Sequence, residues 1–138
     1  MIKKILAAYD GSESADKAFS YALDLAVKYG AELHVIAAAQ PPDYAEEVET
    51  EAILENSKKH FHEVLKSLRG RTEAQGLKAH FEVTVGHPVV QITAYAEDKN
   101  IDLIVVGHRG KTFFERWLIG SVAKKVMSYA PCSVMVVR

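Results

Sequence analysis

The sequence contains little cysteine, little proline and almost no excess of charge. Its single cysteine, Cys132, cannot form a disulfide within the chain and cannot build a cysteine-based zinc site. The 17 lysine and arginine residues are balanced by 18 aspartate and glutamate residues, so the chain lacks the basic surface of a dedicated nucleic-acid-binding protein. No stretch of about 18 consecutive apolar residues is present, which argues against a membrane span. We therefore expect a cytoplasmic protein that binds neither nucleic acid nor membrane.

The composition that is present is typical of one globular domain. The chain has 138 residues, of which 49% are hydrophobic and 25% are charged. Both fractions are ordinary for a globular fold, and a chain of this length buries roughly 68–70% of its unfolded surface when it folds. No internal repeat or low-complexity segment divides it. We expect a single domain that spans residues 1–138.

Short apolar runs alternate with amphipathic segments along the whole chain. The apolar runs predict five strands, over residues 5–9, 33–38, 77–85, 101–106 and 133–137. The segments between them predict four helices, over residues 15–29, 50–75, 89–96 and 121–129. The run at 101–106 is the most hydrophobic and is expected to be a central strand. Strands that alternate with helices form a parallel, doubly wound α/β sheet with right-handed crossovers.

The loop after the fourth predicted strand has the residues of a phosphate-binding site. In an open parallel sheet, ligands bind beyond the carboxyl ends of the strands, where this loop begins. Gly107 and Gly110 permit unusual backbone angles and expose N–H groups. Gly120 and Ser121 open a helix whose first amides can bind an anion. Arg109 adds positive charge, and together these positions predict a phosphate site in two halves.

Two common nucleotide-binding motifs are excluded. A P-loop that ended at Gly110-Lys111-Thr112 would need a glycine at position 105, where the sequence has valine. The first predicted strand is followed by Asp10-Gly11-Ser12-Glu13, whereas the Rossmann fingerprint G-x-G-x-x-G would be required there. Any nucleotide site therefore uses a different pattern of residues.

The glycine spacing and several other segments resemble the universal stress protein family. Gly107, Gly110, Gly120 and Ser121 match the pattern G-x2-G-x9-G-[ST], which marks the members of that family that bind ATP. The resemblance covers the whole chain through five further segments: the first strand leading into Asp10-Gly11-Ser12, Leu33-His34-Val35, Gly86-His87-Pro88, the run from Ile101 to Gly107, and the last nine residues from Ala130 to Arg138. It implies a Rossmann-like sheet of the adenine nucleotide alpha hydrolase type. It also implies an ATP-binding protein that acts as a nucleotide-dependent regulator in the stress response.

The resemblance further implies which residues form the nucleotide site. It assigns Asp10 to the ribose, or to a magnesium or manganese ion that accompanies ATP. It places Val35 against the adenine, with Ala8 and Val106 lining the same pocket. The positions that it assigns to the phosphates and the ribose are Gly107, Arg109, Gly110, Gly120, Ser121 and Val122. Taken alone, Val35 is equally well explained by core packing, and Asp10 by capping of the first helix.

The last predicted strand indicates a dimer, and two other functions stay open. The apolar strand formed by Val134, Met135, Val136 and Val137 lies at an edge of the sheet and is open to pairing. The resemblance implies a homodimer through this strand. A slow ATPase or self-phosphorylating enzyme that uses Ser121 or Thr112 is one alternative function, and a module that binds no nucleotide is the other.

The histidines do not predict a metal site from their positions in the sequence. His60 and His62 lie two apart on a predicted helix, so they point to different faces. His108 lies in the glycine-rich loop and is a candidate for approaching the ligand. Three further histidines have no neighbouring cluster of cysteines or carboxylates in the sequence: His34, His80 and His87. No G-x-S-x-G motif is present, so no catalytic residue is assigned.

Overall fold

The computed structural model describes residues 1–40, 47–109 and 119–138. Within these ranges strands and helices alternate from the first strand to the last, as the sequence predicts. The strands are β1 (Lys4–Ala8), β2 (Glu32–Ala39), β3 (Ala79–Val85), β4 (Leu103–Gly107) and β5 (Ser133–Val137). The helices are α1 (Glu13–Tyr29), α2 (Glu47–Ala74), α3 (Pro88–Asp98) and α4 (Ser121–Tyr129).

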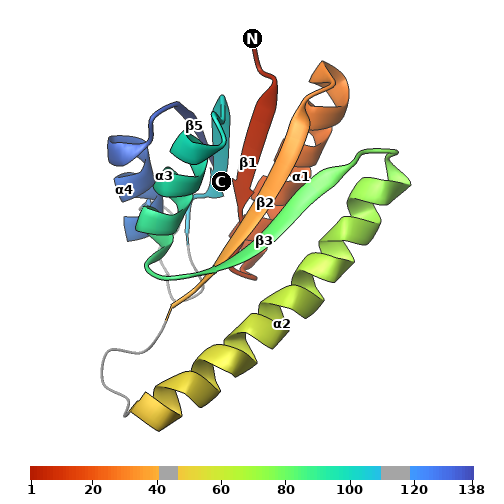
Figure 1. The fold of residues 1–138 in the computed structure, drawn as a ribbon. Coiled ribbons are helices and arrows are strands. Elements are labelled where there is room, and N and C mark those ends of the chain that lie inside the picture. Colours follow the sequence, from red (N-terminus) through yellow and green to blue (C-terminus); the bar gives the residue numbers. More distant parts are fainter. Residues whose placement is uncertain (41–46, 110–118) are drawn as a thin grey trace.

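The five strands form one parallel sheet in the order β3-β2-β1-β4-β5. The chain runs outward from β1 through β2 to β3, then returns across the sheet to β4 and continues to β5. Figure 1 shows α1 and α2 on one face of the sheet and α3 and α4 on the other. This arrangement confirms the predicted doubly wound α/β fold, and β4 is an interior strand as expected. The order of strands reverses between β1 and β4.

Each face of the sheet has its own hydrophobic core. The core under α1 and α2 contains Ala7, Phe19 and Val35, all of which are buried. The core under α3 and α4 contains Ile36 and Val126, together with other buried side chains of β1 and β4. Because successive side chains of a strand point to opposite faces of a sheet, the neighbours Val35 and Ile36 belong to different cores. This alternation decides which face of the sheet each strand residue reaches at the carboxyl ends of the strands.

Local signals in the sequence define where the helices begin and end. The Ser12 hydroxyl accepts a hydrogen bond of 3.0 Å from the Ala15 N–H and caps the start of α1. Gly30 ends α1 with a φ of 61°, a left-handed conformation that glycine adopts without strain.

Only α4 and β5 have the predicted bounds; the other elements differ from them by one to three residues at one or both ends, as α2 and β3 illustrate. Helix α2 begins at Glu47 instead of near residue 50. Strand β3 begins at Ala79, later than predicted, because the Leu77 N–H still bonds to the Thr72 carbonyl at 3.0 Å and closes the end of α2. Within the described ranges, no helix is both long enough and apolar enough to cross a membrane.

Candidate functional site

A cavity of about 270 Å³ lies at the carboxyl ends of β1 and β4, where the strand order reverses. Doubly wound sheets bind their ligands at this kind of position. The volume is close to the lower end of the roughly 300–1,000 Å³ that is typical of small-molecule sites. The cavity is lined by most of the residues that the sequence assigned to the nucleotide: Ala8, Asp10, Val106, Gly107, Arg109, Gly120, Ser121 and Val122.

Of the other two assigned residues, Val35 does not line the cavity and Gly110 lies outside the described residues. Val35 is completely buried in the core under α1 and α2, and its side chain does not line the cavity. The strand register explains this, because Val35 pairs with Ala7, whereas Ala8, which does line the cavity, pairs with Ile36. Thr112, which the alternative of a slow ATPase or self-phosphorylating enzyme would use, also lies outside the described residues.

One side of the cavity is apolar and was missed by the sequence analysis. Ile36 and Ala38 contribute from β2, and Pro88 and Ile92 contribute from the first turns of α3. Side-chain alternation would have found the β2 pair, because once Ala8 faces the cavity its register partner Ile36 must face it too. Pro88 follows the third predicted strand, at an end where ligands can bind, but Ile92 lies a full turn into α3, and no local pattern indicates that it lines the cavity.

The turn before α3 brings Pro88 to the cavity. Gly86 has a φ of 143°, which a residue with a side chain rarely adopts. The Val89 N–H donates to Nδ1 of His87 at 3.3 Å, so His87 caps α3, and Pro88 occupies the first helical position. Gly86-His87-Pro88, one of the segments that resemble the universal stress protein family, forms this turn, and Pro88 supplies part of the cavity wall.

Asp10 is the acidic group of the cavity. It follows β1 and is half-buried, and its Oδ1 accepts a hydrogen bond of 2.9 Å from the Ser12 N–H. The bond fixes the carboxylate at the turn into α1 and leaves acceptor capacity on its other oxygen. Ser12, not Asp10, caps α1. The capping explanation for Asp10 is therefore unnecessary, and its carboxylate is available to a ligand in the cavity.

The first turn of α4 is the cationic end of a helix dipole at the cavity. In any α-helix the first amides have no acceptor within the helix, so the N–H groups at Ser121, Val122 and Ala123 can bind an anion. The Gly120 N–H is used differently, because it donates to the His108 carbonyl at 2.6 Å. Gly120 has a φ of −62° and an extended backbone, which residues other than glycine also adopt.

Gly107 has a packing role that the sequence did not reveal. Its φ is not positive, so the unusual backbone angle expected there is not found. A Cβ added at this position would lie 2.4 Å from the Ser14 Oγ and 2.7 Å from the Ser14 carbonyl carbon. Glycine is therefore required at this position because the end of β4 packs against the backbone of α1, in addition to lining the cavity.

His108 and Arg109 complete the polar side of the cavity. The His108 N–H donates to the Val137 carbonyl at 2.8 Å, and the His108 carbonyl accepts from Gly120. The buried His108 therefore ties the end of β5 to the start of α4. Arg109 is half-buried, and its backbone N–H lies 3.4 Å from the Ser14 Oγ. Arginine at this position supplies the positive charge that the sequence analysis expected beside the glycines.

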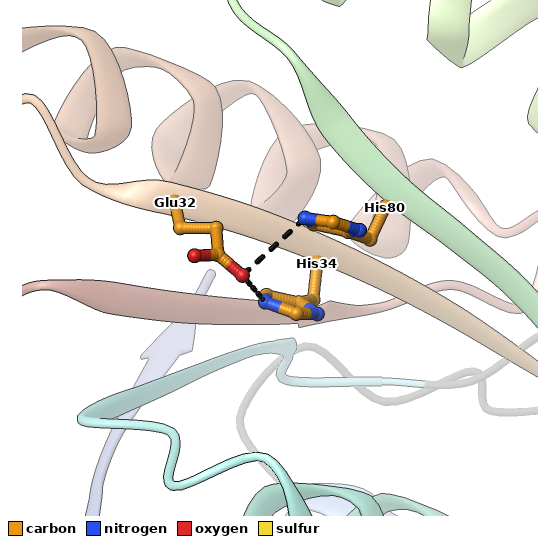
Figure 2. Close-up of side chains that lie close together, drawn as sticks. All are labelled: Glu32, His34 and His80. Carbon is orange, nitrogen blue, oxygen red and sulfur yellow. Dashed lines mark hydrogen bonds and ion pairs between the residues drawn. The ribbon is translucent and has the colours of Figure 1, made fainter.

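A second polar cluster lies at the opposite, amino ends of the strands. Figure 2 shows one oxygen of the Glu32 carboxylate directed toward the rings of both His34 and His80. Glu32 Oε1 lies 2.6 Å from His34 Nε2 and 3.3 Å from His80 Nε2. Burial lowers the pKa of His34, and the hydrogen bond to His34 lowers the pKa of Glu32, so a neutral ring faces a carboxylate at neutral pH. The sequence analysis found no cluster of ligands near His34 and His80 in the sequence. It overlooked Glu32, two residues before His34, and only the pairing of β2 with β3 brings His80 to the same place.

The fold and the cavity define an α/β protein with a cavity at the topological switch point of its sheet. The model of the universal stress protein family matches residues 1–138. A universal stress protein of Methanocaldococcus jannaschii is 37% identical over 141 residues, which cover 100% of this chain and 83% of the relative. The chain belongs to the universal stress protein family.

Solved structures agree with this assignment. The universal stress protein UspA from Lactobacillus plantarum has a TM-score of 0.93 and 26% identity, over 99% of this chain and 98% of that one. A universal stress protein in complex with cAMP has a TM-score of 0.77 and 24% identity, over 99% and 96% of the two chains. A family member from Arabidopsis thaliana with AMP bound has a TM-score of 0.73 and 19% identity, over 98% and 90%. The last two similarities establish a shared fold.

Proposed function

We propose that the cavity at the carboxyl ends of β1 and β4 binds an adenine nucleotide, with ATP as the regulatory ligand. The observation that carries the proposal is the pairing of an apolar wall with a helix N-terminus in one cavity. A nucleotide needs both, because its base is flat and apolar and its phosphates are anionic. The two solved relatives that contain cAMP and AMP support the adenine part of the proposal.

The lining residues fit the chemical parts of the nucleotide. Ile36, Ala38, Pro88 and Ile92 form an apolar surface suited to the base. The first amides of α4 at Ser121 and beyond, which complement negative charge, suit the phosphates. The choice of ATP over AMP rests on the sequence pattern G-x2-G-x9-G-[ST].

Asp10 would hold the ribose or the ion that accompanies ATP. Carboxylate oxygen is a preferred ligand of Mg²⁺, which is usually held by one or two carboxylates together with the phosphates of the substrate. Manganese accepts the same ligands. Bound metal would neutralise charge on the phosphates, and Asp10 contributes the carboxylate and its fixed position at the turn.

We also propose that the protein forms a homodimer through β5. Among the described strands, β5 pairs with β4 alone and lies at an edge of the sheet. The Val137 carbonyl faces β4, because it accepts the His108 N–H. Polar groups of adjacent strand residues point to opposite sides, so those of Val136 face the open edge, where a second copy can pair with them.

Isothermal titration calorimetry with paired charge variants tests the nucleotide site. ATP with magnesium should bind the parent saturably, with AMP and cAMP competing for the same site. Ser121→Glu places a carboxylate at the first turn of α4, where it favours the helix and competes with phosphate for the same amides. The loss of a charged hydrogen bond is worth about 1.5–3 kcal/mol, so ATP should bind roughly 10- to 100-fold more weakly.

Ser128→Glu is the matched control, because it adds the same charge to an exposed position near the other end of α4. It should bind ATP within about twofold of the parent. A folded parent that gives no saturable heat at millimolar ATP would rule out the nucleotide site. Equal ATP affinity in Ser121→Glu and Ser128→Glu would show that the phosphates do not contact the first turn of α4.

A further inference from the structure

We propose that Glu32, His34 and His80 form a binding site for a divalent transition-metal ion, with Zn²⁺ as the best match. The potential ligand atoms of these side chains all lie within 4.8 Å of one another. This site is separate from the proposed nucleotide cavity, because Glu32 is the first residue of β2, whereas the cavity is lined by Ile36 and Ala38 toward the other end.

The sheet register places the three side chains together. Glu32 and His34 are two residues apart on β2, so both point to the face that carries α3 and α4. His80 of β3 is the direct register partner of His34. The two rings are stacked, with centroids 4.6 Å apart and an angle of 18° between their planes. The pairing of the strands therefore fixes the backbone positions of the three residues, and only the ends of their side chains need to move to bind a metal ion.

The distances from the Glu32 carboxylate to the two histidine rings are close to those between donors in a metal site. Zinc binds histidine nitrogen at about 2.0–2.1 Å and carboxylate oxygen at about 2.0–2.2 Å, so neighbouring donors in a tetrahedral site lie roughly 3.3–3.5 Å apart. The 3.3 Å between His80 Nε2 and Glu32 Oε1 already has this value. The 2.6 Å between His34 Nε2 and Glu32 Oε1 is a hydrogen-bond distance that a small rotation of Glu32 would lengthen.

The exposure of the side chains suits entry of a metal ion from solvent. The His34 side chain is 5% exposed and forms the fixed base of the site. The side chains of Glu32 and His80 are 41% and 60% exposed, so they can move to close around an ion. Two imidazoles and one carboxylate are the donor set of several zinc sites, whereas Mg²⁺ and Ca²⁺ prefer oxygen ligands alone. Three protein ligands leave a fourth position for water.

Tyr95 of α3 supplies the second hydrogen bond that a histidine ligand needs. Its hydroxyl lies 2.6 Å from His34 Nδ1, on the side of the ring away from Glu32. When a metal binds at Nε2, the ring proton resides on Nδ1 and is donated to the Tyr95 oxygen, since a hydroxyl can accept as well as donate. Such partners hold ligand rings in place, and their removal typically costs about 10- to 100-fold in metal affinity.

The surrounding charges are mixed. A cavity of about 500 Å³ at the site is also lined by Lys4, Arg69, Lys99 and Glu82. The Lys4 ammonium donates to the Lys99 carbonyl at 3.2 Å, and the Arg69 guanidinium lies over the Phe81 ring, 4.9 Å from its centroid. Both cationic groups thus have contacts of their own. The carboxylates of Glu32 and Glu82 offset part of the charge of these cationic groups. We expect the arrangement of the two imidazoles and the carboxylate to determine the preference for a metal ion.

The test is a Zn²⁺ titration of the tag-free, metal-stripped full chain, followed by calorimetry. The parent should bind one Zn²⁺ per chain, and Co²⁺ at the same site should give visible absorption bands. His80→Gln and Glu32→Gln each remove one exposed ligand, so each should bind Zn²⁺ at least about tenfold more weakly and lose the Co²⁺ bands. Tyr95→Phe should keep the Co²⁺ bands while it lowers the affinity.

His62→Gln is the matched control, because it removes an exposed histidine of α2 that lies outside the cluster. It should bind Zn²⁺ as the parent does. A folded parent that binds no Zn²⁺ at a concentration of 100 micromolar would overturn the proposal. A dissociation constant of that size corresponds to a binding free energy of about 5.5 kcal/mol. Zn²⁺ affinity in His80→Gln equal to that of the parent would do the same. ATP affinity should be unchanged in His80→Gln, so failure of the metal site and failure of the nucleotide site are distinguishable.

Discussion

Gly107→Ala should destabilise the protein because β4 and α1 approach too closely for a side chain. The added Cβ would lie 2.4 Å from the Ser14 Oγ, 2.7 Å from the Ser14 carbonyl carbon and 2.8 Å from the Ser14 oxygen. Optimal separation between carbon atoms is about 3.5–4.0 Å, so the start of α1 must move by roughly 1 Å. Two of these three atoms are backbone, which cannot rotate away, and Ser12 and Phe19 hold α1 in place.

The expected cost is near the upper end of the usual range for overpacking, about 2–3 kcal/mol. For a domain of this size the melting temperature should fall by roughly 6–12 °C. Urea unfolding followed by circular dichroism, without nucleotide, measures the free energy of unfolding directly.

Gly70→Ala is the matched control for this prediction. Gly70 lies within α2, is exposed, and would have no atom within 4 Å of an added Cβ. Alanine is favoured over glycine inside a helix by about 0.5–1 kcal/mol, so this variant should be more stable than the parent. A lower free energy of unfolding in Gly107→Ala together with a higher one in Gly70→Ala would support the argument from packing. A Gly107→Ala variant within about 0.5 kcal/mol of the parent would refute it.

Three further predictions follow from other contacts. Val136→Pro should give a folded monomer in sedimentation, because it removes an N–H that faces the open edge of β5; a folded dimer would point to another interface. Ser12→Ala should lower the free energy of unfolding by about 0.5–2 kcal/mol in urea, because it removes the cap of α1, and no change would contradict the capping role. Hydrogen bonds from the Lys3 and Lys4 N–H groups hold the pKa of Asp102 below its usual value. The carboxylate therefore adds stability above about pH 4, which is lost as the pH falls through the lowered pKa, so Asp102→Asn should weaken this part of the pH dependence. Identical acid unfolding curves for the two proteins would contradict that assignment.

Most of the fold could be predicted from the sequence, because its signals are local. Alternation of apolar runs with amphipathic segments predicts every element and its type, and Gly30 marks the end of α1. Most of the residues assigned to the nucleotide also line one cavity, because the carboxyl ends of β1 and β4 meet at the switch point of the sheet.

The errors came from information that is not local in the sequence. Val35 and Ile36 are both apolar, and only the register with β1 shows that Ile36 faces the cavity. Gly107 resembled a turn glycine, and only the packing of α1 shows that a side chain is excluded there. The spacing of Glu32 and His34 places both on one face of a strand, but His80 becomes their neighbour only when β2 and β3 pair, so the complete cluster could not be found from the sequence.

A crystal structure of the protein with ATP and magnesium tests the central claim most directly. The account predicts that the base lies against Ile36, Ala38 and Ile92, with the phosphates at the first turn of α4 and Asp10 at the ribose or the metal ion. Nucleotide bound elsewhere on the protein, or a cavity left empty at saturating ATP, would contradict it.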